Sequence, residues 1–268
     1  MDDVRQGLKI AHISDLHFGQ IQNRGLVVAL FEDLSRFDLD LIVVSGDHTQ
    51  RSRDREWKLA RSFLKSLKPP LLAVQGNHDI PPYWEPINRL LYSQARFDQY
   101  LGDFVREQCV LGGIAFLGVD STDPRKTTGG TIDSKSLVER MKRLLSESSV
   151  SKIVVCLHHP LYDYSCKQAP GVIADYHQLV SKLSLNGCSM VLHGHLHRSL
   201  ISVEKTAYGS IHHVCAGTAT SSRSRETHLP WQSYNVISFR QNEVEIEQRG
   251  YNPDLKCFDS YDMFISTW

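Results

Sequence analysis

Short apolar runs alternate with segments of helical periodicity through the first 200 residues of the chain. Six runs have the length and apolar character of buried strands, at residues 8–13, 40–45, 71–75, 114–119, 152–157 and 189–194. Between them, apolar residues recur on one helical face within 27–34, 57–67, 137–145 and 176–183. This alternation predicts an α/β fold in which helices cover a largely parallel sheet.

The pattern changes after residue 198. Four further runs read as consecutive strands and predict an antiparallel portion, at 200–205, 210–217, 233–239 and 242–248. The aromatic-rich tail 251–268 is expected to pack against the body of the protein or against another subunit, as in a homodimer. The sequence contains no internal repeat and no low-complexity tract, so we expect a single domain over residues 1–268.

Composition narrows the class of protein. Lysine plus arginine and aspartate plus glutamate number 30 each, so the formal net charge is zero. A protein that grips nucleic acid through bulk charge is therefore disfavoured, although a local basic patch stays open. The N-terminus lacks the features of a signal peptide, and no apolar stretch is long enough to span a bilayer. We expect a cytoplasmic protein with reduced thiols, because no CxxC pair occurs among Cys109, Cys156, Cys166, Cys188, Cys215 and Cys257.

Five of the predicted strands are followed directly by side chains that bind metals. In an open α/β sheet, ligands bind beyond the carboxyl ends of the strands, so these side chains are expected to meet. Each cluster alone occurs often by chance, but five clusters in order at five strand ends indicate one site. The residues are Asp15 and His17, then Asp47, then Asn77, His78 and Asp79, then His158 and His159, then His195 and His197.

The spacing within these clusters has a physical reason, because residues two apart in an extended backbone point the same way. Asp15 and His17 are therefore expected to converge on one ion, and His195 and His197 on adjoining ions. Carboxylate, imidazole and amide ligands suit Mn²⁺, Fe²⁺/Fe³⁺ or Zn²⁺. Two aspartates, one asparagine and four histidines fit two ions that share a bridging carboxylate, which is the usual apparatus for in-line attack on phosphorus.

The motif order D-x-H, G-D, G-N-H-D, H-x-P, G-H-x-H closely resembles the calcineurin-like metallophosphoesterase superfamily, and the motifs cover residues 8–198. The resemblance implies a four-layer α/β/β/α sandwich of two mixed β-sheets flanked by helices, with the metal site at the carboxyl ends of the strands. It also implies that the chain is a metal-dependent phosphoric diester hydrolase.

Carried over position by position, this resemblance divides seven ligands between two metals. The first metal would have Asp15, His17 and His197, the second Asn77, His158 and His195, and the bridge between them would be Asp47. A metal-bridging hydroxide would be the nucleophile. His78 would stabilise charge on the phosphoryl group or protonate the leaving oxygen. Asp79 is the natural partner to orient His78, with capping of the next turn as the alternative.

The run VLHGHLH places three histidines at every second position. His195 and His197 follow the glycine, where the strand ends and the backbone opens toward the metals. His193 precedes the glycine, and the other ligands already fill both metal sites. We therefore expect His193 to have a structural or supporting role.

Four further residues are candidate substrate contacts, each with an ordinary structural alternative. His159 could contact the substrate phosphate or turn into local packing. His48, which follows the proposed bridge, could support the site through a hydrogen bond. Arg51 could attract an anionic substrate or begin a solvated helix, and Tyr162 could form a wall for a base or sugar or pack within its own loop.

The motifs leave the substrate open. Protein phosphatases of the superfamily continue the second motif as G-D-x-V-D-R-G, whereas this chain reads GDHTQRS, so a phosphoprotein phosphatase is disfavoured. The short motifs are similar to those of bacterial class III cyclic-nucleotide phosphodiesterases, so we expect a small phosphodiester such as a 3′,5′-cyclic nucleotide.

Three alternatives remain. A pyrophosphatase of the UDP-diacylglucosamine type, acting in lipid A synthesis, requires an apolar groove, which segments 81–105 and 160–176 would build. A DNA nuclease is disfavoured by the neutral charge. A non-catalytic metal-binding scaffold is disfavoured because the seven ligand positions and His78 are all intact.

Overall fold

The computed structural model describes residues 7–164, 171–228 and 230–268, which form thirteen strands and six helices. The helices are Arg24–Leu34 (α1), Asp54–Ser66 (α2), Pro86–Leu91 (α3), Ala95–Leu101 (α4), Ser134–Leu145 (α5) and Tyr176–Leu185 (α6). The strands are Leu8–Ile13 (β1), Leu41–Val44 (β2), Leu71–Ala73 (β3), Val105–Arg106 (β4), Gln108–Leu111 (β5), Ile114–Gly118 (β6), Lys152–Cys156 (β7), Cys188–His193 (β8), Leu200–Thr206 (β9), Gly209–Cys215 (β10), Ser233–Phe239 (β11), Glu243–Asn252 (β12) and Cys257–Thr267 (β13).

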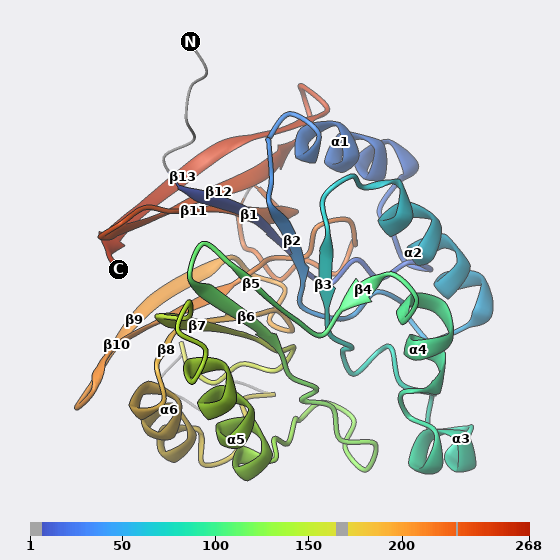
Figure 1. The fold of residues 1–268 in the computed structure, drawn as a ribbon. Coiled ribbons are helices and arrows are strands. Elements are labelled where there is room, and N and C mark those ends of the chain that lie inside the picture. Colours follow the sequence, from blue (N-terminus) through green and yellow to red (C-terminus); the bar gives the residue numbers. More distant parts are fainter. Residues whose placement is uncertain (1–6, 165–170, 229) are drawn as a thin grey trace.

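The strands form two mixed sheets that pack on each other (Figure 1). The seven-stranded sheet has the order β13-β12-β11-β1-β2-β3-β4, and the six-stranded sheet has the order β5-β6-β7-β8-β10-β9. Each contains a parallel part, β1 to β4 in one sheet and β6-β7-β8-β10 in the other. Apolar side chains from both sheets fill the space between them, including Ile10, Val43, Phe116, Val154 and Met190.

Helices cover the outer face of each sheet and complete four layers. Leu30 of α1 and Trp57 of α2 are fully buried in the apolar cluster on the seven-stranded sheet. Leu137 of α5 and Val180 of α6 lie in the corresponding cluster on the six-stranded sheet. Figure 1 shows α1 and α2 on one side of the two sheets and α5 and α6 on the opposite side. The expected α/β/β/α sandwich is therefore confirmed.

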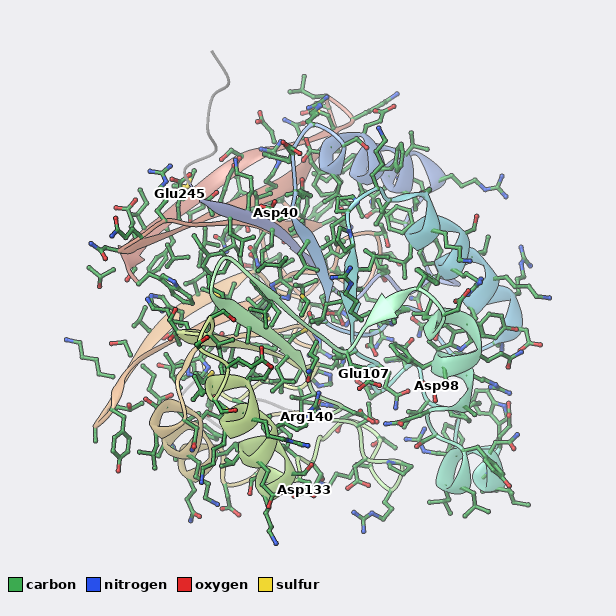
Figure 2. The ribbon with its side chains drawn as sticks, viewed as in Figure 1. Asp40, Asp98, Glu107, Asp133, Arg140 and Glu245 are labelled. Carbon is green, nitrogen blue, oxygen red and sulfur yellow. The ribbon has the colours of Figure 1, made fainter. Side chains whose placement is uncertain are left out.

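Local signals in the sequence explain why these helices form where they do, and α5 is a clear example. Its first turn is capped by Asp133, labelled in Figure 2, whose carboxylate accepts hydrogen bonds from the backbone of Lys135 and Ser136 at 3.1 Å. Leu137 and Met141 recur at helical spacing and are buried against the sheet. A cap at one end and a continuous apolar face thus fix both the start and the orientation of the helix.

The antiparallel strands expected after residue 198 are present, but they do not lie together, because they are divided between the two sheets. The β9–β10 hairpin joins the six-stranded sheet, because β10 pairs in parallel with β8. Strands β11 to β13 join the other sheet, because β11 pairs antiparallel with β1. Apolar patterning predicts which runs are buried, but it does not identify strand partners that are separated by more than 200 residues.

The tail that was expected to pack on the body or on another subunit lies at the edge of the seven-stranded sheet. It contains β13, which pairs antiparallel with β12. Phe258 is buried among the apolar residues of this sheet, whereas Tyr261, Met263 and Ile265 are exposed. Packing of this tail against a second copy of the chain therefore stays a prediction.

Two further findings concern the cysteines and the helices. The described cysteines, Cys109, Cys156, Cys188, Cys215 and Cys257, are free thiols, and Cys166 lies outside the described residues. No helix within the described ranges has both the length and the apolar character that crossing a membrane requires.

Candidate metal centre

The structure brings all seven expected ligands together at one edge of the sandwich, where strands of both sheets end. Strands β1, β2 and β3 of one sheet and β7 and β8 of the other each lead into a loop that carries at least one of them. All are buried except Asn77, which is partly exposed. The residues are Asp15 and His17 after β1, Asp47 after β2, Asn77 after β3, His158 after β7, and His195 and His197 after β8.

The first cluster contains Asp15, His17, Asp47 and His197, whose ligand atoms all lie within 4.8 Å of one another. The Nε2 atoms of His17 and His197 are 3.1 Å apart. The Oδ1 atom of Asp15 lies 3.1 Å from the His197 Nε2 and 3.6 Å from the His17 Nε2. Four atoms that can donate lone pairs therefore surround one small volume.

The second cluster contains Asn77, His158 and His195. The Asn77 Oδ1 lies 3.1 Å from the His158 Nε2 and 3.0 Å from the His195 Nδ1. The two imidazole nitrogens are 3.3 Å apart. An amide oxygen and two ring nitrogens thus converge on a second small volume.

Asp47 joins the two clusters. Its Oδ2 lies 3.5 Å from the His17 Nε2, and its Oδ1 lies 3.4 Å from the His158 Nε2. The backbone N–H of His78 donates to Oδ1 at 2.9 Å and fixes the orientation of the carboxylate. The geometry gives each cluster one oxygen of the same carboxylate, as a bridging ligand requires.

The backbone explanation offered for the ligand spacing is corrected by the structure. Both Asp15 and His17 are left-handed, with φ of 52° and 47°, and they follow β1 rather than extend it. His195 and His197 are left-handed too, with φ of 70° and 55°. The side chains therefore converge because the chain turns sharply at each residue, and not because they alternate along an extended strand.

Two glycines allow the loops to approach the ligands closely. A Cβ atom on Gly76 would lie only 2.5 Å from the backbone nitrogen of Asp47 and 2.9 Å from its Cγ. A Cβ atom on Gly194 would collide with the side chains of Ser14 and Asp15. The glycines in the GNHD and GHLH motifs thus have a steric role in the assembly of the site.

The histidines are oriented by hydrogen bonds on their outer nitrogens. The Nδ1 of His158 donates to the backbone oxygen of Ser45 at 2.8 Å, and the Nδ1 of His197 donates to that of Arg223 at 2.7 Å. In the neutral form of each ring, the proton is then on Nδ1, and the Nε2 lone pair points into the cluster.

The residues fit a pair of metal cations. The Oδ1 of Asp15 is buried but accepts no hydrogen bond among the described residues, although two imidazole nitrogens face it. Converging lone pairs without protons between them repel one another unless a cation lies between them. The mixture of carboxylate, imidazole and amide donors is the one that Mn²⁺, iron or Zn²⁺ accepts.

The electrostatics of the site point in the same direction. Burial alone would raise the pKa of Asp47, but His158 and the neighbouring histidines hold it well below its usual value. Burial alone would lower the pKa of His158, but Asp47 raises it to about 9. The cluster therefore favours a positive charge beside the bridging carboxylate.

The candidate catalytic residues occupy different positions. His78 is partly exposed, and its ring lies edge-on to that of His17, with centroids 4.9 Å apart. Its Nδ1 contacts the backbone oxygen of Gln50 at 2.7 Å, so Asp79 is not the group that orients the ring. Asp79 is fully buried, and its carboxylate accepts hydrogen bonds from His48, Thr49 and Gly76, which holds two loops together.

The four candidate substrate contacts fall into two groups. Arg51 is exposed and lines a cavity of about 170 Å³ together with Asn77 and His78. His159 is buried directly behind the second cluster, where its Nδ1 contacts the Ser121 hydroxyl at 2.9 Å. His48 is buried against Trp57 and Asp79, away from that cavity. Tyr162 stacks on His213, with ring centroids 4.9 Å apart.

His193 lies outside both clusters, as expected for a structural residue. Its Nε2 contacts the hydroxyl of Tyr164 at 3.0 Å, and its Nδ1 contacts the backbone oxygen of Gly194 at 3.2 Å. The ring is fully buried, which lowers its pKa to about 3 and keeps it neutral.

The sequence motifs did not reveal two residues beside His78. The guanidinium of Arg223 donates to the His78 Nε2 at 3.0 Å and to the Gln50 Oε1 at 3.3 Å. Gln50 lies three residues after Asp47, so its fixed distance from the G-D motif could have identified it as a candidate site residue. Arg223 lies in the polar loop 217–232, where no spacing distinguishes it from Arg225.

Comparison with known proteins decides the family. The profile of the calcineurin-like phosphoesterases matches residues 8–199, which is more than half of the chain. The chain belongs to the calcineurin-like phosphoesterase family. A dimetal phosphatase from Danio rerio has the same fold, with a TM-score of 0.63 over 98% of this chain and 99% of that one, at 13% identity.

Two relatives of this calcineurin-like phosphoesterase agree with the branch that its motifs resemble. It is 27% identical to a probable cyclic nucleotide phosphodiesterase of Synechococcus, over 72% of this chain and 75% of the relative. It is 29% identical to a glycerophosphodiester phosphodiesterase of Enterobacter lignolyticus, and that match covers 56% of each protein. A shorter match, 34% identical, covers 29% of this chain and 24% of a UDP-2,3-diacylglucosamine pyrophosphatase of Chlamydia muridarum.

Proposed function

We propose that this protein is a metal-dependent hydrolase of a small phosphodiester, with a 3′,5′-cyclic nucleotide as the leading substrate. One observation carries the proposal: two ligand clusters share the Asp47 carboxylate, and His78 lies beside them. When bound, the pair of cations would supply the positive charge and Lewis acidity that phosphoryl transfer requires.

The chain's own residues would then hold and orient the reacting group. Asp15, His17 and His197 would hold one cation, and Asn77, His158 and His195 the other, with Asp47 between them. His78 reaches the same space from the more exposed side of the site. It would donate a hydrogen bond to a phosphoryl oxygen or hold a proton for the leaving oxygen.

The cavity beside His78 supports a substrate with a planar part. Its wall includes Arg51, Tyr83 and Trp84, and the Arg51 guanidinium lies 5.8 Å from the centre of the Trp84 ring. Aromatic rings and a guanidinium plane are the surfaces on which nucleobases stack. A phosphodiester at the metal centre would place an attached base in this cavity.

A lipid-linked substrate is the second candidate, and exposed apolar residues favour it. The segment that precedes and forms α3 carries Tyr83, Trp84, Ile87, Leu90 and Leu91, each between 48% and 70% exposed. Figure 1 shows α3 at an outer corner of the fold. Exposed apolar side chains that gather on one segment commonly mark a surface that receives an apolar ligand. The other segment proposed for an acyl groove, 160–176, lies partly outside the described residues.

The first experiment tests hydrolysis itself. Mn²⁺-loaded protein is expected to hydrolyse bis(p-nitrophenyl) phosphate, and a chelator is expected to abolish the activity. If the metal-loaded protein does not hydrolyse this diester, the proposal is wrong. If the folded protein takes up no transition metal, a non-catalytic binding scaffold on this fold replaces it.

The second experiment separates the two substrate classes. Turnover of 3′,5′-cyclic AMP is compared with turnover of a UDP-diacylglucosamine, in the wild type and in an Ile87→Ser/Leu91→Ser variant. If the substrate is lipid-linked, this variant loses only the lipid activity, whereas the control Leu185→Ser, which changes an exposed leucine on α6, keeps both. A cyclic-nucleotide enzyme retains its activity in all three proteins. A single domain, a homodimer, a cytoplasmic location and the identity of the metals stay predictions.

A further inference from the structure

The loop that follows β10 wraps around one of the proposed metal ligands. The Nδ1 of His197 donates to the backbone oxygen of Arg223 at 2.7 Å, and the backbone N–H of Arg225 donates to the His197 oxygen at 3.2 Å. The Arg223 N–H also donates to the Ser221 hydroxyl at 3.1 Å. The position of this loop is therefore tied to the metal centre through its backbone.

The same anchor places the Arg223 side chain beside the candidate catalytic histidine. Its Nη1 donates to the His78 Nε2 at 3.0 Å and to the Gln50 Oε1 at 3.3 Å. Among residues 7–164, 171–228 and 230–268, no carboxylate forms an ion pair with this guanidinium. Neither His78 nor Gln50 carries a negative charge, so the positive charge of Arg223 is left for an anion at the site.

We propose that Arg223 binds a phosphoryl oxygen of the substrate, a role that rests on the proposed function. The guanidinium would exchange its contact with His78 for one with the oxygen. Two consequences follow from this exchange. The charge that grows on the phosphoryl group during attack meets a fixed cation, and the Nε2 of His78 becomes free for the leaving group.

The side chain and the backbone of Arg223 have separable roles. The backbone oxygen holds His197, whereas the guanidinium makes no contact with a proposed metal ligand. Replacing the side chain should therefore leave the loop and the metal centre in place. This separation allows a substrate-binding role to be distinguished from a purely structural one.

The test compares Arg223→Gln and Arg223→Lys with Arg225→Gln, a change to an exposed arginine in the same loop. Activity is measured on bis(p-nitrophenyl) phosphate, a monoanion, and on p-nitrophenyl phosphate, a dianion at pH 8. Manganese content, thermal midpoint and calorimetric binding of inorganic phosphate are measured on the same proteins.

Arg223→Gln is expected to lower kcat/KM for the diester by about 10- to 100-fold, the loss typical of a charged hydrogen bond. The loss should be larger for the dianionic monoester, and phosphate should bind about 10-fold more weakly. Lysine at this position should recover part of each loss, because it keeps the charge but not the fork geometry. Manganese content and the Arg225→Gln control should match the wild type.

Two outcomes would overturn the role of Arg223. One is an Arg223→Gln variant with wild-type kinetics and phosphate affinity. The other is a variant that loses manganese together with activity, which would make the side chain structural. If the wild type hydrolyses neither substrate, the proposed function fails, but the phosphate measurement still shows whether Arg223 binds the anion.

Discussion

Adding a single methyl group at Gly76 tests how closely the loops of the proposed metal centre are packed. In Gly76→Ala, the new Cβ atom would lie 2.5 Å from the backbone nitrogen of Asp47 and 2.9 Å from its Cγ. Ordinary van der Waals contacts between such atoms begin at about 3.5 Å. The loops that carry Gly76 and Asp47 must therefore separate by about 1 Å. Asp47 holds one oxygen toward each cluster, and its displacement therefore disturbs both.

The expected loss follows from that displacement. A misplacement of about 1 Å at a reacting centre lowers the rate about 100-fold, and a disturbed ligand orientation weakens metal binding by about 10- to 100-fold. We expect both effects in Gly76→Ala, measured as kcat/KM for bis(p-nitrophenyl) phosphate and as the calorimetric affinity for Mn²⁺.

The matched control is Gly25→Ala on α1. There the nearest atom to the new Cβ is the side-chain oxygen of Asn23 at 3.3 Å, and alanine is a better helix former than glycine. This variant should keep wild-type activity and stability. Wild-type activity and Mn²⁺ affinity in Gly76→Ala would refute the close packing of the GNHD loop on Asp47.

Three further predictions concern other residues. His78→Ala should lose at least about 100-fold in kcat while keeping its Mn²⁺ content, and near-normal turnover would contradict its catalytic role. His195→Gln should lose Mn²⁺ measured by plasma mass spectrometry, whereas His193→Gln should keep it and melt at a lower temperature. Equal loss of Mn²⁺ from both variants would mean that His193 does not have the separate, structural role assigned to it. Arg249→Leu removes the two hydrogen bonds, of 2.6 and 2.8 Å, that pair Arg249 with the buried Asp33. It should cost about 3–5 kcal/mol in urea unfolding, and an unchanged midpoint would show that Asp33 is satisfied by other groups.

The convergence of the seven candidate ligands could be predicted from the sequence, because each of them follows a recognisable apolar strand. Residues at the carboxyl ends of parallel strands reach the same edge wherever the strands lie in the sheet. The prediction therefore did not depend on knowing that β1 and β8 belong to different sheets. For the same reason, the division of the final strands between the two sheets does not affect which side chains meet at this edge.

The supporting contacts could not be predicted in this way. Arg223 reaches His78 only because β10 returns the chain beside β8 and the loop is anchored on His197. Asp79 is next to His78 in the sequence, yet its carboxylate turns away toward His48 and Thr49. Adjacency along the chain says little about side-chain contacts where the backbone turns sharply at each residue.

The turns themselves explain why aspartate and histidine suit these positions. Five of the seven proposed ligands have positive φ, a conformation that costs most residues about 1–2 kcal/mol and that aspartate and histidine tolerate better than most. Contacts from neighbouring loops hold the turns, such as those from Thr218 to the Asp15 oxygen and from the His17 N–H to the Asp47 oxygen. The first of these contacts needs both sheets, because Thr218 follows β10 of the six-stranded sheet and Asp15 follows β1 of the seven-stranded sheet. Residues that can both bind a cation and adopt a left-handed turn allow short loops to direct several ligands into one small volume.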